Sequence, residues 1–193
     1  IGFHRSNHTD IGGERAYGNE ITSFLDASMV YGSSEDQHAA IRGDGGKMLL
    51  DDDGFLPKDS AGQYMGGDVR SGENVGLTSL HTVFAREHNR IVDELADRDP
   101  DLSDDALYTL ARRVVETEIQ KITYDEFLPK ILGEGALGDY AGFDADVNPT
   151  VSVEFSTAAF RFRHTLLSPT IQRLAENGGE AADALELREA FFN

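Results

Sequence analysis

A glycine-spaced polar loop that runs directly into a long periodic helix is the feature that most constrains the fold of this chain. The loop covers residues 67–74, and the segment after it repeats apolar side chains at helical spacing. The apolar positions are Leu80, Phe84, Ile91 and Leu95. This spacing places them on one face of a helix, with Asn74 as the N-cap and Asp99-Pro100 as the stop. The sequence therefore predicts a buried helix that holds a polar loop rigidly enough to carry a site.

A second long helix is predicted to follow Ser103, whose hydroxyl suits an N-cap, and to extend to about Leu128. Gly/Asp-dense stretches lie between the periodic segments and indicate turns. Residues 1–19 show no periodicity and are predicted to be irregular, whereas residues 180–192 are predicted to form an acidic amphipathic helix. The fold class is therefore mainly α, a helical domain with long irregular Gly/Asp-rich loops and little β structure.

The charge balance narrows the classes of partner. The 193 residues carry 35 Asp and Glu against 17 Lys and Arg, a formal net charge of −18. Such a field repels nucleic acid and anionic membrane surfaces, so neither is an expected partner. No apolar run approaches the roughly 20 residues of a membrane-spanning helix. Because the chain has no Cys, any metal ligand must come from His, carboxylate, hydroxyl or carbonyl groups.

An alternating run of oxygen donors is a candidate cation site. Its donors are Thr22, the Phe24 carbonyl, Asp26 and Ser28. Hard oxygen ligands of this kind are what Ca2+ collects in six- to eight-fold coordination. The alternative is an ordinary turn whose hydroxyl and carboxylate groups cap a helix.

Histidines and arginines provide the other candidate groups. The apolar segment 152–167 contains Arg161, Arg163 and His164 and is predicted to be internal. For His164 the alternative to ligation is a hydrogen-bonded core histidine. His81 and His88 are interpreted as packed or hydrogen-bonded structural residues.

Three stretches in one order resemble the animal-type haem peroxidase superfamily, which includes bacterial members. They are residues 21–32, 67–89 and 159–166. The catalytic domain of that family begins well before Ile1, so residues 1–193 are interpreted as an internal part of a single such domain. The resemblance extends over almost the whole chain and implies the mainly α haem peroxidase fold.

The resemblance also implies roles for individual residues. Arg70 matches the distal arginine, which stabilises charge on the departing peroxide oxygen, and His164 matches the proximal ligand of haem b. Glu73 matches a carboxylate that forms an ester with the haem, although a salt bridge with Arg70 is the alternative. Arg161 is expected to pair with a haem propionate. Thr22, Phe24, Asp26 and Ser28 match the family's calcium loop, completed by a carboxylate outside the chain.

The implied activity is reduction of hydrogen peroxide with oxidation of a small electron donor or halide, in a secreted or extracellular protein. None of the other five histidines stands in the distal-histidine motif, so this part alone is expected to be inactive and to need the remaining part of the domain. Two residues depart from the family pattern. Asn74 replaces a haem-linking methionine found in a relative, and Arg163 replaces a common glycine. The alternative is a non-catalytic, calcium-stabilised adhesion or assembly module.

Overall fold

The computed structural model describes residues 8–19, 21–175, 177–179 and 184–191. Its internal contacts divide the chain into two compact units, each described by itself. The larger unit consists of residues 25–143 and 168–193, and the smaller of residues 1–24 and 144–167.

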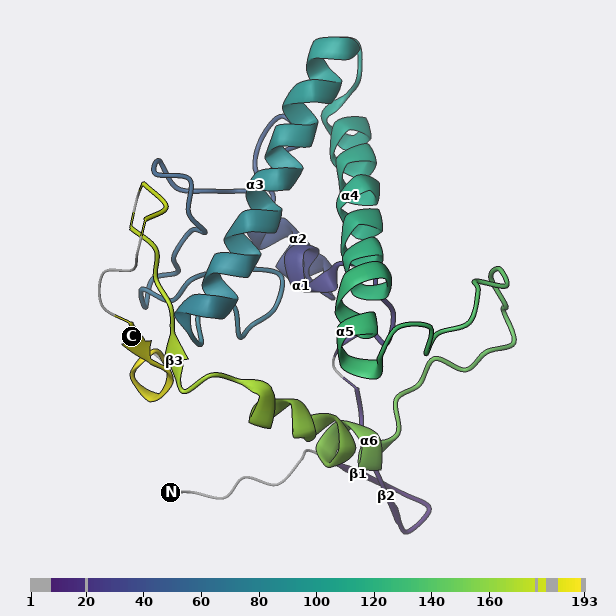
Figure 1. The fold of residues 1–193 in the computed structure, drawn as a ribbon. Helices are drawn as coiled ribbons and strands as arrows, with labels where there is room; N and C mark the ends of the chain where they lie inside the picture. The colour runs from purple at the N-terminus through teal and green to yellow at the C-terminus, as the bar shows by residue number, and fades with distance from the viewer. Residues whose placement is uncertain (1–7, 20, 176, 180–183, 192–193) are drawn as a thin grey trace. The chain divides into compact units, whose positions relative to one another are not determined.

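The larger unit is built on a pair of adjacent helices, α3 (Val75–Arg98) and α4 (Asp104–Lys121), which lie side by side in Figure 1. Asn74 caps α3, because its Oδ1 accepts a hydrogen bond from the Leu77 amide at 3.0 Å. Ser103 caps α4 in the same way, accepting from the Ala106 amide at 3.3 Å. Both helix starts predicted from the sequence are confirmed.

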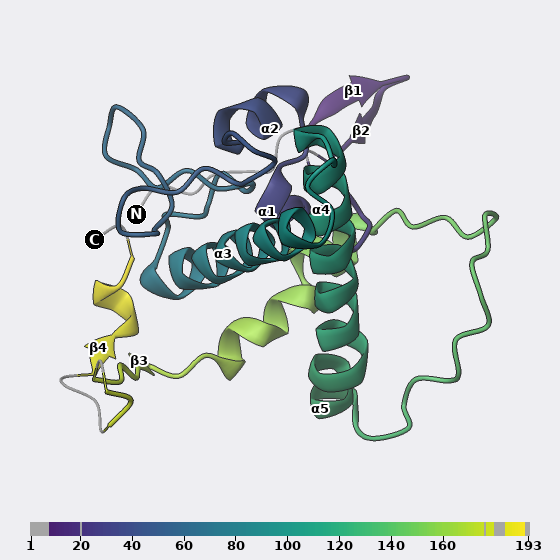
Figure 2. The ribbon, with the colours of Figure 1, turned by 90° about the horizontal axis from the view of Figure 1, so that it is seen from above.

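Two short helices, α1 (Ser28–Tyr31) and α2 (Glu35–Ile41), complete the helical core, and α1 lies against α3 (Figure 2). The buried apolar side chains come from α1 to α4 and from the loop between α2 and α3. Among them are Val30, Tyr31, Ile41, Met48, Leu56, Ala85, Val92, Leu107, Ala111 and Val115. Burial of this set provides the main stabilisation of the unit.

The buried face of α3 differs from the predicted one at its N-terminal end. Leu80 was expected in the core but is 53% exposed, whereas the next residues, His81 and Thr82, are buried. The buried face is therefore shifted by about one residue from the predicted one. Polar side chains of the first turns contact the preceding loop, as Thr78 does when its hydroxyl donates to the Ser71 carbonyl. Ile91 is buried as predicted, and Phe84 and Leu95 pack against the core.

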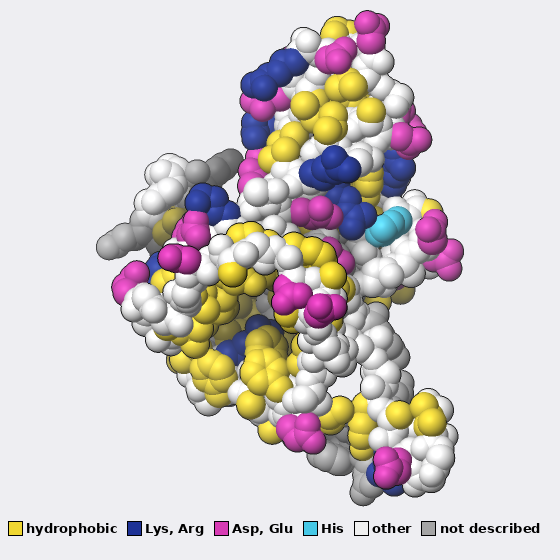
Figure 3. All heavy atoms as spheres, turned by 90° about the vertical axis from the view of Figure 1, so that its right-hand side faces the viewer, with side chains coloured by type: hydrophobic (Ala, Val, Ile, Leu, Met, Phe, Trp, Pro, Cys, Tyr) yellow, Lys and Arg dark blue, Asp and Glu magenta, His cyan; other side chains and the backbone are white. Residues whose placement is uncertain are grey.

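The second helix extends further than predicted. After α4 the backbone widens into a π-helix, η1 (Ile122–Phe127), and continues as α5 (Leu128–Leu132). Pro129 lies in the first turn of α5 and, having no amide hydrogen, cannot donate to the π-helical turn that precedes it. Gly133, with φ of 95°, ends the helix. On the face that Figure 3 shows, charged side chains of both signs lie beside apolar ones.

The loop between α2 and α3 contains the same turn twice. The Asp51 carboxylate accepts from the amides of Asp53 (3.1 Å) and Phe55 (2.8 Å). Eight residues later, Asp59 accepts from the amides of Ala61 (2.8 Å) and Gln63 (2.9 Å). The acidic clusters of this loop therefore close solvated turns, as Asp side chains commonly do.

The strands are few and short, which confirms the mainly α fold class. In the smaller unit β1 (Thr9–Ile11) pairs antiparallel with β2 (Glu14–Ala16), so the prediction of irregular structure in residues 1–19 is wrong there. The smaller unit also contains α6 (Val153–Thr157) and the 3-10 helix η2 (Ala159–Leu166).

The predicted C-terminal helix is also wrong within the residues that the structure describes. That part of the larger unit forms β4 (Leu185–Glu186), paired antiparallel with β3 (Thr170–Ile171), and then the 3-10 turn η3 (Leu187–Glu189). Strand pairing, together with the bond from the Leu187 amide to the Pro169 carbonyl, takes the place of helical bonds. The rest of the predicted helix, residues 180–183 and 192, lies outside the described residues. Among the described residues, no helix is long and apolar enough to cross a membrane.

Candidate functional site

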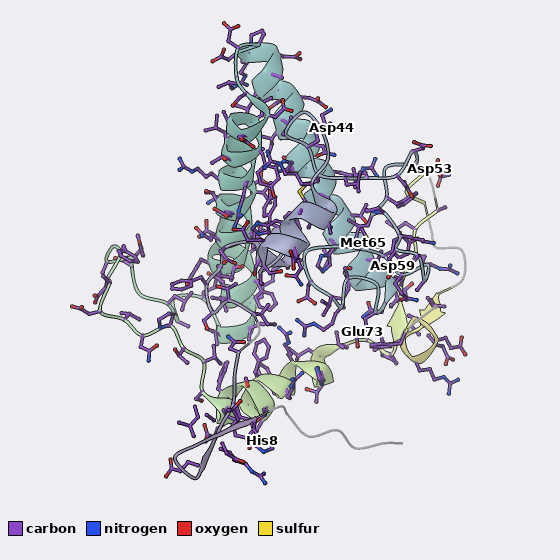
Figure 4. The ribbon with its side chains drawn as sticks, turned by 180° about the vertical axis from the view of Figure 1, so that it is seen from behind. His8, Asp44, Asp53, Asp59, Met65 and Glu73 are labelled. Carbon is purple, nitrogen blue, oxygen red and sulfur yellow. The ribbon has the colours of Figure 1, made fainter. Side chains whose placement is uncertain are left out.

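A cavity of about 580 Å³ in the larger unit lies between α2 and the loop before α3. Its lining combines apolar side chains, among them Ile41 and Met65, with four charged ones, which are Asp59, Asp68, Arg70 and Glu73. Met65, Asp59 and Glu73 are labelled in Figure 4, where all three belong to the loop region on one side of α3. A cavity of this size that exposes apolar surface beside charged groups suits a ligand of moderate size.

Arg70 is held by Asp68 through three hydrogen bonds. The Arg70 Nε donates to Asp68 Oδ1 at 2.8 Å, its Nη2 donates to Oδ2 at 2.7 Å, and its backbone amide donates to Oδ1 at 2.8 Å. This bond with the arginine lowers the pKa of the Asp68 carboxyl, and the carboxylate in turn raises the pKa of Arg70. Both shifts favour the charged forms of the two groups.

The partner of Arg70 differs from the residue that sequence reasoning weighed. The i, i+3 spacing suggested a salt bridge with Glu73, but the ion pair forms with Asp68, whose side chain is only 13% exposed. The signal was present as an Asp-x-Arg spacing, since an aspartate in a turn readily bonds the amide two residues later. Glu73 lines the cavity without an ion pair to Arg70.

The loop carrying Arg70 is fixed on both sides. Ser71 is buried, its hydroxyl donates to the Tyr64 carbonyl at 3.0 Å, and its own carbonyl accepts from Thr78 Oγ1 on α3 at 2.7 Å. Gly67 packs directly on the backbone of α1. A Cβ at this position would lie 2.4 Å from the Gly32 nitrogen. The loop is therefore positioned by its neighbours in α1 and α3, as the sequence predicted for a loop attached to a buried helix.

His81, on the first turns of α3, lies behind this loop. It is only 4% exposed, and its Nδ1 is buried without a hydrogen-bond partner. Burial lowers the pKa of His81, while the nearby Asp68 carboxylate acts in the opposite direction. A Cβ on Gly66, which lines the cavity, would come within 3.2 Å of this Nδ1. His81 is therefore separated from the cavity by the backbone of Gly66.

His88, two turns later, is completely hydrogen-bonded. Its Nε2 lies 2.9 Å from the Gly46 carbonyl, and its Nδ1 lies 2.9 Å from the Tyr31 hydroxyl. A carbonyl only accepts, so Nε2 carries the proton and Nδ1 accepts from Tyr31. Burial raises the pKa of Tyr31, which keeps this phenol protonated as the donor. The prediction of a hydrogen-bonded structural histidine is confirmed for His88.

The four residues of the predicted calcium loop divide between the two units. Thr22 and Phe24 lie in the smaller unit, where Thr22 Oγ1 accepts from the Phe24 amide at 3.0 Å. Asp26 and Ser28 lie in the larger unit, where Asp26 Oδ1 accepts from the Ser28 amide at 3.0 Å at the start of α1. These are the turn and capping bonds of the alternative interpretation. In the part of the chain that the structure describes, no group of three or more His, Cys, Asp or Glu could hold a metal ion.

His164 lies in η2 of the smaller unit, and its side chain is exposed. The prediction that segment 152–167 is internal is therefore wrong for the described structure, because the long side chains of Phe162 and Leu166 on the same turns are also exposed. Arg163 stacks on Phe160, with its guanidinium carbon 3.8 Å from the ring centroid. The extra cation next to His164 thus has a partner. Arg161 is exposed and forms no ion pair with any residue that the structure describes.

Comparison with known sequences shows what this chain is similar to. The model of the family described as animal haem peroxidase matches residues 1–193. The chain is 41% identical to the human "Peroxidasin homolog" over 201 residues, covering 91% of this chain and 14% of that protein. It is 39% identical to human "Thyroid peroxidase", covering 91% of this chain and 22% of that protein. The chain therefore spans only a minor part of the curated relatives that it matches.

Comparison with solved structures agrees with the sequence comparison. "Peroxidase A" from Dictyostelium discoideum is similar with a TM-score of 0.79 and 35% identity, covering 88% of this chain and 36% of that chain. A fatty acid alpha-dioxygenase from Oryza sativa gives a TM-score of 0.73 at 22% identity, which shows likeness of fold alone. Because the family model matches the whole chain, this protein belongs to the animal haem peroxidase family.

Proposed function

We propose that this chain is part of the catalytic domain of a haem peroxidase that reduces hydrogen peroxide and oxidises a small electron donor or halide. The observation that carries the proposal is that Arg70, which by its resemblance to the family motif corresponds to the distal arginine, lines the cavity of its unit. His164 is proposed as the axial ligand of haem b. The remaining part of the domain, on the same or another chain, would supply the distal histidine.

The residues present fit such a cofactor. The cavity joins apolar side chains to a permanently charged arginine, which suits a largely apolar group that reacts with a polar oxidant. His164 offers an imidazole on an exposed turn.

Each side chain has a defined task in this proposal. Haem, when bound, supplies the redox chemistry, and the protein supplies ligation, orientation and charge. Arg70 presents fixed positive charge where negative charge develops on the departing oxygen of peroxide. Arg161 pairs with a propionate through its planar guanidinium. Glu73, which lines the same cavity as Arg70, is proposed to form an ester with a methyl group of the haem: the carboxyl group would lose its proton, the methyl group would lose one hydrogen, and hydrogen peroxide would take up the two electrons and be reduced to water.

Calcium is proposed as a second bound species. Thr22, the Phe24 carbonyl, Asp26 and Ser28 would supply oxygen ligands, completed by a carboxylate from outside the chain. A hydrogen-bonded turn does not preclude this, because a carboxylate or hydroxyl oxygen has more than one lone pair. We also propose a secreted or extracellular location, on family resemblance.

One experiment tests the function: expression of the full-length protein with His164→Ala and Arg70→Ala variants. We expect His164→Ala to lose the Soret band, because the variant lacks the imidazole that is proposed to bind the iron on the proximal side. Arg70→Ala is expected to keep the band but to react with hydrogen peroxide at least about 100-fold more slowly, the scale of losing one charge-stabilising donor. Elemental analysis for calcium and mass spectrometry of the peptide that contains Glu73 use the same preparations.

A full-length protein with no Soret band under haem-replete expression would contradict the enzyme proposal. Such a protein that still binds calcium would be the non-catalytic adhesion or assembly module. A normal Soret band in His164→Ala would remove the axial-ligand assignment alone.

A further inference from the structure

The orientation of Arg70 depends on a single neighbouring side chain. Arg70 is half exposed, whereas the side chain of Asp68 is only 13% exposed. Within the part of the chain that the structure describes, Asp68 is the only residue with which the Arg70 guanidinium forms an ion pair. An arginine side chain has several rotatable bonds, so an exposed guanidinium without such a partner would occupy many orientations.

Asp68 is itself held firmly enough to orient another group. Its backbone carbonyl accepts from the Ser71 amide at 3.0 Å, and the preceding Gly67 packs against α1. Its Oδ1 accepts from both the Arg70 amide and Nε, so the carboxylate bonds to the backbone and the side chain of the same residue. Two parallel bonds from Nε and Nη2 fix the plane of the guanidinium as well as its distance.

The pair also decides which donors of Arg70 remain for a ligand. A guanidinium carries five N–H groups, and Asp68 takes one from Nε and one from Nη2. The donors left are the two on Nη1 and the second on Nη2. The second Nη2 donor and one Nη1 donor share the outer edge next to the one that Asp68 occupies, the other Nη1 donor points back toward Cδ, and the residue lines the cavity. A peroxide or small anion in the cavity therefore meets one defined set of donors.

We propose that Asp68 is the positioning residue for Arg70: it holds the guanidinium so that its Nη1 edge serves a peroxide or small anion in the cavity. This inference rests on the proposed peroxidase function. Asp68 differs from the two other turn aspartates of this loop. Asp51 and Asp59 accept from backbone amides in a similar way, but neither forms an ion pair with a described arginine.

The test uses full-length, haem-loaded protein and a double-mutant cycle. The variants are Asp68→Ala, Arg70→Ala and the double variant, with Asp51→Asn as the matched control, because Asp51 bonds backbone amides of its turn and forms no ion pair with a described arginine. Each is assayed for its rate constant with hydrogen peroxide, and for its dissociation constant for azide by optical titration. We expect Asp68→Ala to lower the rate constant about tenfold and to weaken azide binding, because a misplaced catalytic group loses much of its effect. Asp51→Asn should behave as wild type.

The cycle separates positioning from a general structural effect. If Asp68 acts through Arg70, Asp68→Ala changes neither quantity by more than about twofold in the Arg70→Ala background. Should Asp68→Ala fail to fold, Asp68→Asn takes its place. It keeps the side-chain volume and the acceptor for the Arg70 amide, but not both bonds to the guanidinium.

The outcomes of this test differ for the two proposals. A full-length protein that binds no haem would overturn the proposed function. A normal peroxide rate in Arg70→Ala with haem bound would overturn the role of Arg70, and with it the positioning role of Asp68. A slow Arg70→Ala with a normal Asp68→Ala would overturn only the positioning role. An Asp68→Ala effect that persists at full size in the Arg70→Ala background would also overturn it, because Asp68 would then act independently of Arg70.

Discussion

His81 and His88 lie on the same face of α3, seven residues apart, and both are buried, yet their surroundings differ. Both ring nitrogens of His88 are hydrogen-bonded, one to Tyr31 and one to Gly46. The Nδ1 of His81 is buried without a partner, next to the loop that carries Asp68 and Arg70. One helix face thus contains a complete polar network and an incomplete one.

The different hydrogen bonding of the two histidines distinguishes a residue that maintains the fold, His88, from one that lies near the candidate site, His81. Buried polar groups in native proteins are nearly always paired, because an unpaired group costs about 1–3 kcal/mol. The His88 network follows this rule and joins α1, α3 and the loop that contains Gly46. The His81 region departs from the rule beside a charged cavity, which is where proteins commonly retain such costs.

The largest expected effect is on stability, from His88→Phe. The variant leaves the Tyr31 hydroxyl and the Gly46 carbonyl buried without partners, and each costs about 1–3 kcal/mol. The free energy of unfolding should therefore fall by about 2–5 kcal/mol, measured by urea denaturation. Tyr31→Phe is the matched control, because it removes one bond of the same network and should cost less. Equal effects of the two substitutions would show that the network does not act as described.

A smaller effect is expected from pH. Burial lowers the pKa of both His81 and His88 below the value of about 6.5 that an unfolded histidine has. The unfolded chain then binds more protons than the native one as pH falls below about 6.5, so stability is complete above that pH and is lost toward the lowered pKa values. Melting temperatures between pH 8 and 5 should therefore fall on the acidic side.

The Phe variant of either histidine should flatten part of this acid-side slope. A slope that is unchanged in His88→Phe would mean that other groups, such as the many carboxylates, determine the acid sensitivity. Comparing the two variants then shows how much each histidine contributes to the fall in melting temperature at acidic pH.

Local features were predictable from the sequence wherever a short-range rule decided them. Asn74 and Ser103 cap their helices as their side chains predict, and Gly133 ends the long helical segment. The position of Leu80 was not predictable, because the rotation of α3 depends on contacts with a loop whose structure periodicity does not reveal. The C-terminal helix failed for a similar reason, since pairing of β4 with β3 is a tertiary choice.

In the candidate site, too, some residues could be predicted from the sequence and others could not. The resemblance pointed to Arg70 and Glu73, and the structure brings both to one cavity. Asp68, the partner of Arg70, could have been identified from the Asp-x-Arg spacing alone. The unpaired Nδ1 of His81 had no sequence signal, because the apolar periodicity around it is the same as around His88.

The smallest effect is expected for His81→Phe. A phenyl ring keeps the approximate shape of the imidazole and removes a buried nitrogen that has no partner, so the free energy of unfolding should change by no more than about 1 kcal/mol. The loss of the favourable contact with the Met29 backbone works against the gain from removing the unpaired Nδ1. Urea denaturation beside His88→Phe provides the measurement, with matched chemistry at two positions of one helix. A loss as large as that of His88→Phe would show that Nδ1 has a partner in solution, such as a buried water, and that both networks serve the fold. A small loss would mean instead that the His81 side chain is not needed for the stability of the fold. Its role would then concern the neighbouring loop that carries Asp68 and Arg70.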